Sequence, residues 1–397
     1  MNFVRVKFKF KISHAVLIFL LALALRLISV FLQSKGFVLP DSGTDTLRFH
    51  DYALALHQEI FWDALLMFDP GGSYVWSWLL SFWYRATVPS FYSGLLFVSL
   101  ISSFSCVLLY KLCCFYSGKK IALGLAFAYA GLPSSIIFGS ILLRESIIIF
   151  FVLLGLLFLV KCVRFGKARH YIYAVVSFLC AIIFHPGVFF SAGLALFFTV
   201  FLVESVKFKF SALIIFLSLI TVSLVSIFFF EFGYSKIWWL FSGDGFLDSI
   251  RFRLERALFY IDGRSLVSHA GLAFSNLNES FFSIGVVFFS FILSPFFDPG
   301  FPRFYDVVRV IPSLAAFLAF FLFWAVPYGQ KGKEVFFMFF LPAFFGFLIF
   351  SLFSSEAWAS FRHLNKFFPL VIVFFAYFLD SFLKEIKYRG FSYNSRS

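Results

Sequence analysis

Apolar runs repeat along almost the whole chain and are separated by short polar breaks. The first run, His14 to Leu32, is long enough to cross a bilayer as a helix, which takes about 20 residues. Runs such as Ile147 to Leu159 lack the period-two alternation that is typical of the strands of a membrane β-barrel. The pattern predicts an all-α polytopic membrane protein, built as a single membrane-embedded domain over residues 1–397.

Basic residues gather beside some polar breaks and avoid others. The segment before His14 is basic, which predicts a cytoplasmic N-terminus. The break over residues 33–70 holds six acidic residues and two basic ones, so it is predicted to be an external acidic loop. The other basic breaks mark cytoplasmic turns and a cytoplasmic C-terminus; they lie at 111–120, 161–169, 207–209, 331–333 and 384–389.

These orientations allow about ten full crossings and two partial helices. One partial helix, Gly71 to Tyr84, is short and rich in Trp and Tyr, which favours an interfacial position. The other, Phe281 to Phe296, is predicted to be re-entrant and follows a second external loop at 230–280. The predicted crossings are His14–Leu32, Phe91–Tyr110, Ile121–Phe138, Ile147–Val160, Tyr171–Phe184, Val188–Val203, Phe210–Phe229, Val308–Val326, Val335–Phe353 and Phe367–Phe382.

The composition agrees with a membrane protein and favours membrane lipids over nucleic acid as the partner. The chain is 61% hydrophobic and 13% charged, with a formal net charge of +13. Because the basic residues flank the apolar runs, orientation and contact with membrane lipids explain the charge better than binding of nucleic acid. The five cysteines form no disulfide or metal-binding pattern. No phosphate-binding glycine loop is present, which disfavours an enzyme that uses cytoplasmic nucleotide sugars.

Polar residues with catalytic chemistry are concentrated in the first external loop. Asp41, Asp45 and Asp51 lie there with His50, close to the end of the first crossing. Charged groups near lipid are costly and are often functional. Asp45 begins an i, i+4, i+8 series with Phe49 and Ala53, which predicts a short helix. The alternative is that Asp45 only caps this helix and Asp41 only makes a turn.

Two further external turns carry candidate groups. Arg144 and Glu145 begin an otherwise apolar run, so Glu145 is a candidate second carboxylate that faces an aqueous cavity. The alternative is a self-satisfied Arg–Glu pair that anchors the helix end. His185 precedes Pro186 and is a candidate substrate-binding residue or a plain interfacial histidine. The sequence also leaves open a cation site in which Asp45 and Glu145 hold Mg²⁺ or Mn²⁺.

A third group consists of external arginines. The guanidinium fork suits a lipid-linked phosphate or diphosphate, although the same residues also suit lipid headgroups. The candidate residues for substrate binding are Arg251, Arg253 and Arg256 in the loop at 230–280, together with Arg362 and His363. The latter two lie in the segment 356–366, which is predicted to be external and precedes the last crossing. Arg26 lies inside the first crossing and is expected to snorkel toward the outer surface.

Several of these segments resemble the GT-C superfamily of membrane glycosyltransferases. Asp45, Phe49 and Ala53 match the acidic motif that follows the first crossing in that family, and Pro133 through Arg144–Glu145 is similar to its second acidic turn. Further similar segments are Asp69-Pro70-Gly71-Gly72-Ser73-Tyr74, Ser294-Pro295-Phe296-Phe297 and Phe361-Arg362-His363-Leu364 up to Pro369. Many members carry a paired acidic motif where this chain has a lone Asp45, so Asp41, Asp45 and Asp51 all stay open as the base.

The resemblance implies a transferase at the outer face of a bacterial cytoplasmic membrane. It would move a sugar or oligosaccharide from a polyprenyl-(di)phosphate carrier, such as undecaprenyl phosphate, to a glycan or lipid-linked acceptor in surface-polysaccharide synthesis. In this mechanism Asp45 is the general base and Glu145 positions the acceptor or a metal ion. An O-antigen repeat-unit polymerase is the nearest alternative. A lipid-linked oligosaccharide flippase is the alternative of another class, although no internal repeat is visible.

Overall fold

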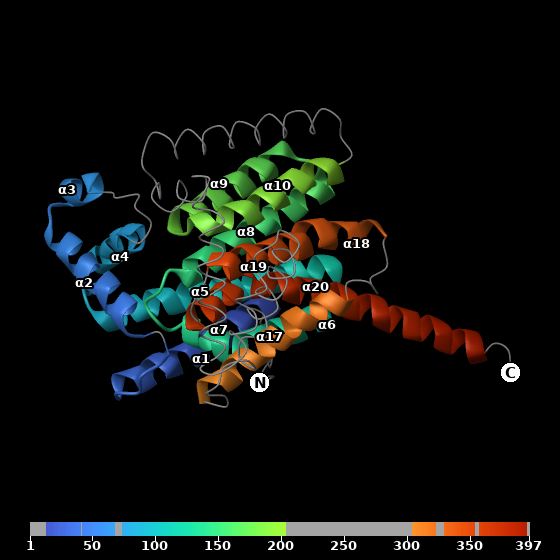
Figure 1. The fold of residues 1–397 in the computed structure, drawn as a ribbon, viewed down its shortest axis with the longest axis horizontal. Helices are drawn as coiled ribbons and strands as arrows, with labels where there is room; N and C mark the ends of the chain where they lie inside the picture. Colours follow the sequence, from blue (N-terminus) through green and yellow to red (C-terminus); the bar gives the residue numbers. More distant parts are fainter. Residues whose placement is uncertain are drawn as a thin grey trace, which may run out of the picture.

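A computed structural model describes most of the chain, and all regular secondary structure in the described residues is helical (Figure 1). The described residues are 13–40, 42–67, 74–203, 304–322, 329–353 and 357–394. No strand occurs among them, which confirms the predicted all-α class.

Among the described residues, four helices are long and apolar enough to cross a membrane. They are α1 (His14–Ser34), α5 (Phe91–Tyr116), α8 (Glu145–Phe165) and residues Arg362–Lys387 of α20 (Ala357–Asn394). Shorter apolar helices are α9 (Ala168–Phe184), α10 (Phe189–Leu202) and Val310–Leu322 of α17 (Phe304–Leu322). The count of about ten crossings stays a prediction, because Phe210–Phe229, the loop at 230–280 and Phe281–Phe296 lie outside the described residues.

The helices pack as a bundle with α8 and α20 among its most buried members. α8 lies along α5 and α9, and α1 lies along α5. Gly155 allows the close approach of α8 to α9, because a Cβ there would lie 2.9 Å from the ring of Phe178. α20 contacts α5, α6, α8, α17 and α19. This central position brings the start of α20 beside the start of α8.

The helices of the acidic loop and the helix that follows it lie together at one end of this bundle. They are α2 (Thr44–Gln58), α3 (Phe61–Leu66) and α4 (Tyr74–Ala86), at the left in Figure 1. The helix predicted from Asp45, Phe49 and Ala53 is α2, and Phe49 and Ala53 are buried. His50 accepts or donates a hydrogen bond at 2.7 Å between its Nδ1 and the Tyr84 hydroxyl, which joins α2 to α4.

Three predicted crossings have different extents in the structure. The run Ile121–Phe138 forms two helices, α6 (Lys119–Gly131) and α7 (Pro133–Phe138), because proline favours the first turn of a new helix and disfavours a helical residue before it. The run Val335–Phe353 consists of α18 (Gln330–Val335), a π-helical turn over Phe336–Phe340 and α19 (Leu341–Phe353). The predicted external segment 356–366 is largely the start of α20, so Arg362 and His363 are helical residues.

A second polar cluster lies far from the acidic loop in the sequence. Glu334 in α18 is buried and pairs with Arg164 of α8 at 2.9 Å, and the Tyr116 hydroxyl donates to the same carboxylate at 3.4 Å. Burial raises the pKa of Glu334, while Arg164 and the Tyr116 hydrogen bond act to lower it. This cluster fixes α18 to the ends of α5 and α8 that lie away from Glu145.

Candidate functional site

Side chains from four separate segments meet at the end of the bundle that carries α2. Their meeting point is the start of α8, where Arg144 is the N-cap residue and Glu145 the first helical residue. We call this group the charged cluster. Its members are Asp45 and Arg48 of α2, Arg144 and Glu145 at the start of α8, His185 after α9, and Arg362, His363 and Lys366 of α20.

Asp45 lies at the open side of the charged cluster. Its Oδ1 pairs with Nη2 of Arg48 at 3.2 Å, and its Oδ2 pairs with Nη1 of Arg362 at 3.4 Å. The Asp45 side chain is 41% exposed, so solvent and a substrate can reach it. The N-cap of α2 is Gly43, without a side-chain cap, so the carboxylate of Asp45 is engaged by arginine instead of capping the helix.

Glu145 lies at the buried side of the charged cluster. Its Oε1 is 3.4 Å from Nε of Arg362 and 3.4 Å from Nζ of Lys366. The side chains of Glu145 and Lys366 are only 2% and 1% exposed. Oε2 of Glu145 is buried and accepts no hydrogen bond within the described part of the chain. Arg362 therefore links the exposed carboxylate of Asp45 to the buried carboxylate of Glu145.

Two histidines adjoin these charges with defined ring orientations. The backbone N–H of Gly187 donates to Nδ1 of His185 at 3.2 Å, so the proton of neutral His185 lies on Nε2. Nδ1 of His363 lies 2.9 Å from Nζ of Lys366. The His363 ring stacks on Phe350 of α19 with centroids 4.2 Å apart, and it meets the His185 ring edge-on at 5.4 Å. Both histidines are half-buried within the charged cluster.

Cations outnumber carboxylates in the charged cluster. Arg48, Arg144, Arg362 and Lys366 oppose only Asp45 and Glu145. Burial lowers the pKa of Arg144, Glu145 raises it and Arg362 lowers it, yet a guanidinium stays charged at any physiological pH. The remaining positive charge, in a partly desolvated setting, favours an anionic ligand such as a phosphate group.

The structure brings together six of the residues proposed from the sequence and places two others, Asp51 and His50, elsewhere. Asp45, Arg144, Glu145, His185, Arg362 and His363 belong to the charged cluster. Asp51 is exposed on α2, and the ring of His50 contacts Tyr84 and Phe91. Asp41, Arg251, Arg253 and Arg256 lie outside the described residues.

Lys366 and Arg48 belong to the charged cluster but are not among the site residues predicted from the sequence. Lys366 follows Arg362 by four residues, which places the two on one face of a helix. The prediction of an external segment at 356–366 hides this spacing, because it places both residues outside a helix. Arg48 likewise follows Asp45 by three residues on α2, a spacing that permits the observed pair.

The carboxylates proposed as metal ligands face cations in this structure. Asp45 contacts two guanidinium groups, and Glu145 contacts a guanidinium and an ammonium group. Within the described residues, no three His, Cys, Asp or Glu side chains come close enough to hold a metal ion.

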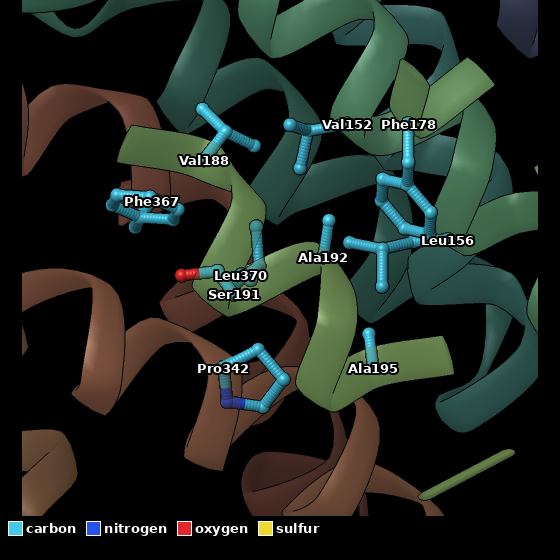
Figure 2. A pocket seen from close by; sticks show the side chains of 10 residues that line it. All are labelled: Val152, Leu156, Phe178, Val188, Ser191, Ala192, Ala195, Pro342, Phe367 and Leu370. Carbon is cyan, nitrogen blue, oxygen red and sulfur yellow. The ribbon is translucent and has the colours of Figure 1, made fainter. Parts of the chain in front are cut away.

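A small cavity beside the charged cluster has a different character. Figure 2 shows its lining, which is apolar apart from Ser191; Phe367, the neighbour of Lys366, lies on one side. Its interior has room for about one water molecule. The cavity is therefore too small for a sugar or a prenyl chain, and the open side near Asp45 is the better candidate for substrate entry.

Comparisons with protein families and with curated proteins found no match. No protein-family model matches the chain, and no curated protein matches its sequence significantly.

Replacing His185 with Asn is expected to reduce the acid sensitivity of the folded protein. Burial lowers the pKa of His185 well below 6.5, and the charges of Lys366, Arg144 and Arg362 and the nearby His363 lower it further. Because the unfolded chain protonates first, stability falls as the pH drops below about 6.5, by up to about 1.4 kcal/mol per pH unit. Asn removes this titration and retains an oxygen that accepts from Gly187.

The measurement is the apparent unfolding temperature in detergent at pH 7.5 and 5.5. The matched control is His57→Asn in α2, which should keep the full decrease of the wild type. An equal decrease in His185→Asn and wild type would contradict the buried, neutral state of His185.

Proposed function

We propose that this protein is a membrane glycosyltransferase that uses a polyprenyl-(di)phosphate-linked donor at the outer face of the membrane. The observation that carries the proposal is the convergence of an exposed carboxylate, Asp45, with an excess of buried and half-buried cations through Arg362. A sugar transfer from a phosphate carrier needs both features, a base for the acceptor and positive charge for the leaving group.

The chemistry assigns one role to each side of the charged cluster. The acceptor hydroxyl gives its proton to Asp45 while its oxygen forms a bond to the anomeric carbon. The bond between that carbon and the phosphate oxygen breaks, and its electron pair leaves with the phosphate. Arg362, Arg144 and Arg48 stabilise the charge that develops there. Glu145 and Lys366 hold Arg362 in place from the buried side.

The finer topology belongs to the same proposal. It comprises about ten crossings, cytoplasmic termini and an external charged cluster, and it is supported by the distribution of basic residues in the sequence. The external loop at 230–280, with Arg251, Arg253 and Arg256, then supplies additional positive charge for the carrier phosphates or a groove for the acceptor.

The test is a gene deletion in the source organism, analysed by gel electrophoresis of surface polysaccharide and by extraction of lipid-linked intermediates. A transferase predicts lipid-linked units that lack one sugar, and complementation should restore them. Single complete units that persist on the outer leaflet indicate a polymerase, which also transfers sugar from a lipid carrier. Complete units trapped on the inner leaflet indicate a flippase and would refute the proposal.

A further inference from the structure

Arg26 lies in the middle of α1 and is fully buried, which corrects the expectation that it snorkels outward. Its Nε donates to Oγ of Ser102 at 2.8 Å, and its Nη2 donates to Oγ and O of Ser135 at 2.8 and 3.2 Å. Its Nη1 donates to the carbonyl oxygen of Ala22 at 2.9 Å. One guanidinium therefore connects three helices, α1, α5 and α7.

No carboxylate pairs with Arg26 among the residues that the structure describes. A charge buried in a membrane helix without a counter-charge is expensive, and such residues commonly have a role beyond packing. Apolar contacts would hold α1 in the bundle without the free-energy cost of burying polar groups. Two of the four buried residues of α1 are nevertheless polar, namely Arg26 and Ser29. The role of these polar contacts therefore depends on which segment they position.

The polar side chains of α1 hold the end of α7 and the residues that follow it. Ser29 lies one turn after Arg26, and its Oγ accepts from Oγ of Ser140 at 2.9 Å. Gln33 donates from Nε2 to the carbonyl oxygen of Ser140 at 2.9 Å. A Cβ on Gly139 would lie 2.4 Å from Nε of Arg26, so only glycine fits against the guanidinium. We call these contacts between α1 and residues 135–140 the polar seam.

The polar seam ends just before the charged cluster. Four residues after Ser140 the chain reaches Arg144, and Glu145 begins α8. Ser146 donates from its Oγ to the carbonyl oxygen of Phe138 at 2.9 Å, which ties the start of α8 back to the end of α7. The turn that presents Arg144 and Glu145 is thus fixed at its near end by α1.

We propose that Arg26 is a positioning residue for Arg144 and Glu145, acting through Ser135, Gly139 and Ser140. The inference rests on the proposed function, because it assigns α1 the task of setting the anion-binding geometry of the charged cluster. Its physical basis is the guanidinium fork, which fixes direction as well as distance when it donates to several oxygens at once.

The test compares Ser102→Ala with Ser99→Ala. Both serines are buried in α5, but Oγ of Ser99 donates only to Leu95 of its own helix. Farnesyl diphosphate serves as the probe, and its affinity for the detergent-solubilised protein is measured by calorimetry. Ser102→Ala and Arg26→Lys are expected to weaken binding by about tenfold or more, since small displacements of charged groups have large effects. Ser99→Ala should leave the affinity unchanged.

A second readout needs no ligand. Arg26→Lys and Glu145→Gln are made singly and together, and the apparent unfolding temperatures are compared. The decrease caused by Glu145→Gln should shrink in the Arg26→Lys protein, because a misplaced Glu145 contributes less. Additive decreases, or unchanged affinity in a folded Ser102→Ala protein, would overturn the inference. If the wild type fails to bind the probe while the decreases are non-additive, the positioning role stands and the proposed function fails.

Discussion

Replacing Asp45 with Asn is expected to lower the rate of sugar transfer by at least about 100-fold, the usual contribution of a general base. The amide has the same shape, and its oxygen still accepts from one of the two arginines that pair with separate oxygens of Asp45, so the fold should survive. It has no capacity to take the acceptor proton. The expected signature is therefore a protein that is inserted and stable but accumulates the lipid-linked donor.

The measurement uses membranes from a deletion strain complemented with each variant, and it follows the lipid-linked intermediate over time. Asp51→Asn is the matched control, because Asp51 is an exposed carboxylate on the same helix, six residues further on. It should retain close to wild-type transfer. Full transfer by Asp45→Asn would exclude Asp45 as the base and direct attention to Asp41.

Replacing Glu145 with Gln is expected to destabilise the protein by about 3–5 kcal/mol, because it leaves Lys366 buried without a counter-charge. Lys366→Met should cost less, since Glu145 keeps its ion pair with Arg362. The double variant Glu145→Gln/Lys366→Met should recover much of the loss seen in Glu145→Gln, because both buried charges are then gone. The measurement is the unfolding free energy or temperature of each variant in the same detergent.

The chain offers a control for this experiment within α20. Lys384 and Asp380 form an i, i+4 pair in which the lysine side chain is 73% exposed. Lys384→Met should change stability by less than about 1 kcal/mol, because solvent already screens that pair. If Glu145→Gln changed stability no more than Lys384→Met, the buried pair would contribute nothing to the fold.

The positions of the helices follow closely from local patterns. The run His14–Leu32 predicts α1 nearly to its ends, and Asp45, Phe49 and Ala53 predict a helix that the structure contains as α2. An apolar segment must form a helix within lipid, because every backbone N–H and C=O needs a partner inside the segment. That requirement concerns neighbouring residues, so the sequence expresses it directly.

The extents of some helices depend on contacts that no local pattern contains. The start of α20 has charges at Arg362 and Lys366, which suggest an external loop when the residues are considered alone. In the folded protein these charges lie beside Glu145 and Asp45, so the helix continues through them into the bundle. The energy of that placement comes from residues more than 200 positions away.

Arg26 shows most clearly the difference between what a local pattern predicts and what tertiary contacts decide. The sequence established that a membrane helix carries an arginine, and the expectation of snorkelling follows from the cost of a charge in lipid. The folded protein meets that cost with Ser102 and Ser135, two hydroxyls from distant helices. Hydropathy fixes which segments enter a membrane, because it depends on each residue's own solvation. The partners of a buried charge depend on how the helices pack, and only the assembled bundle specifies them.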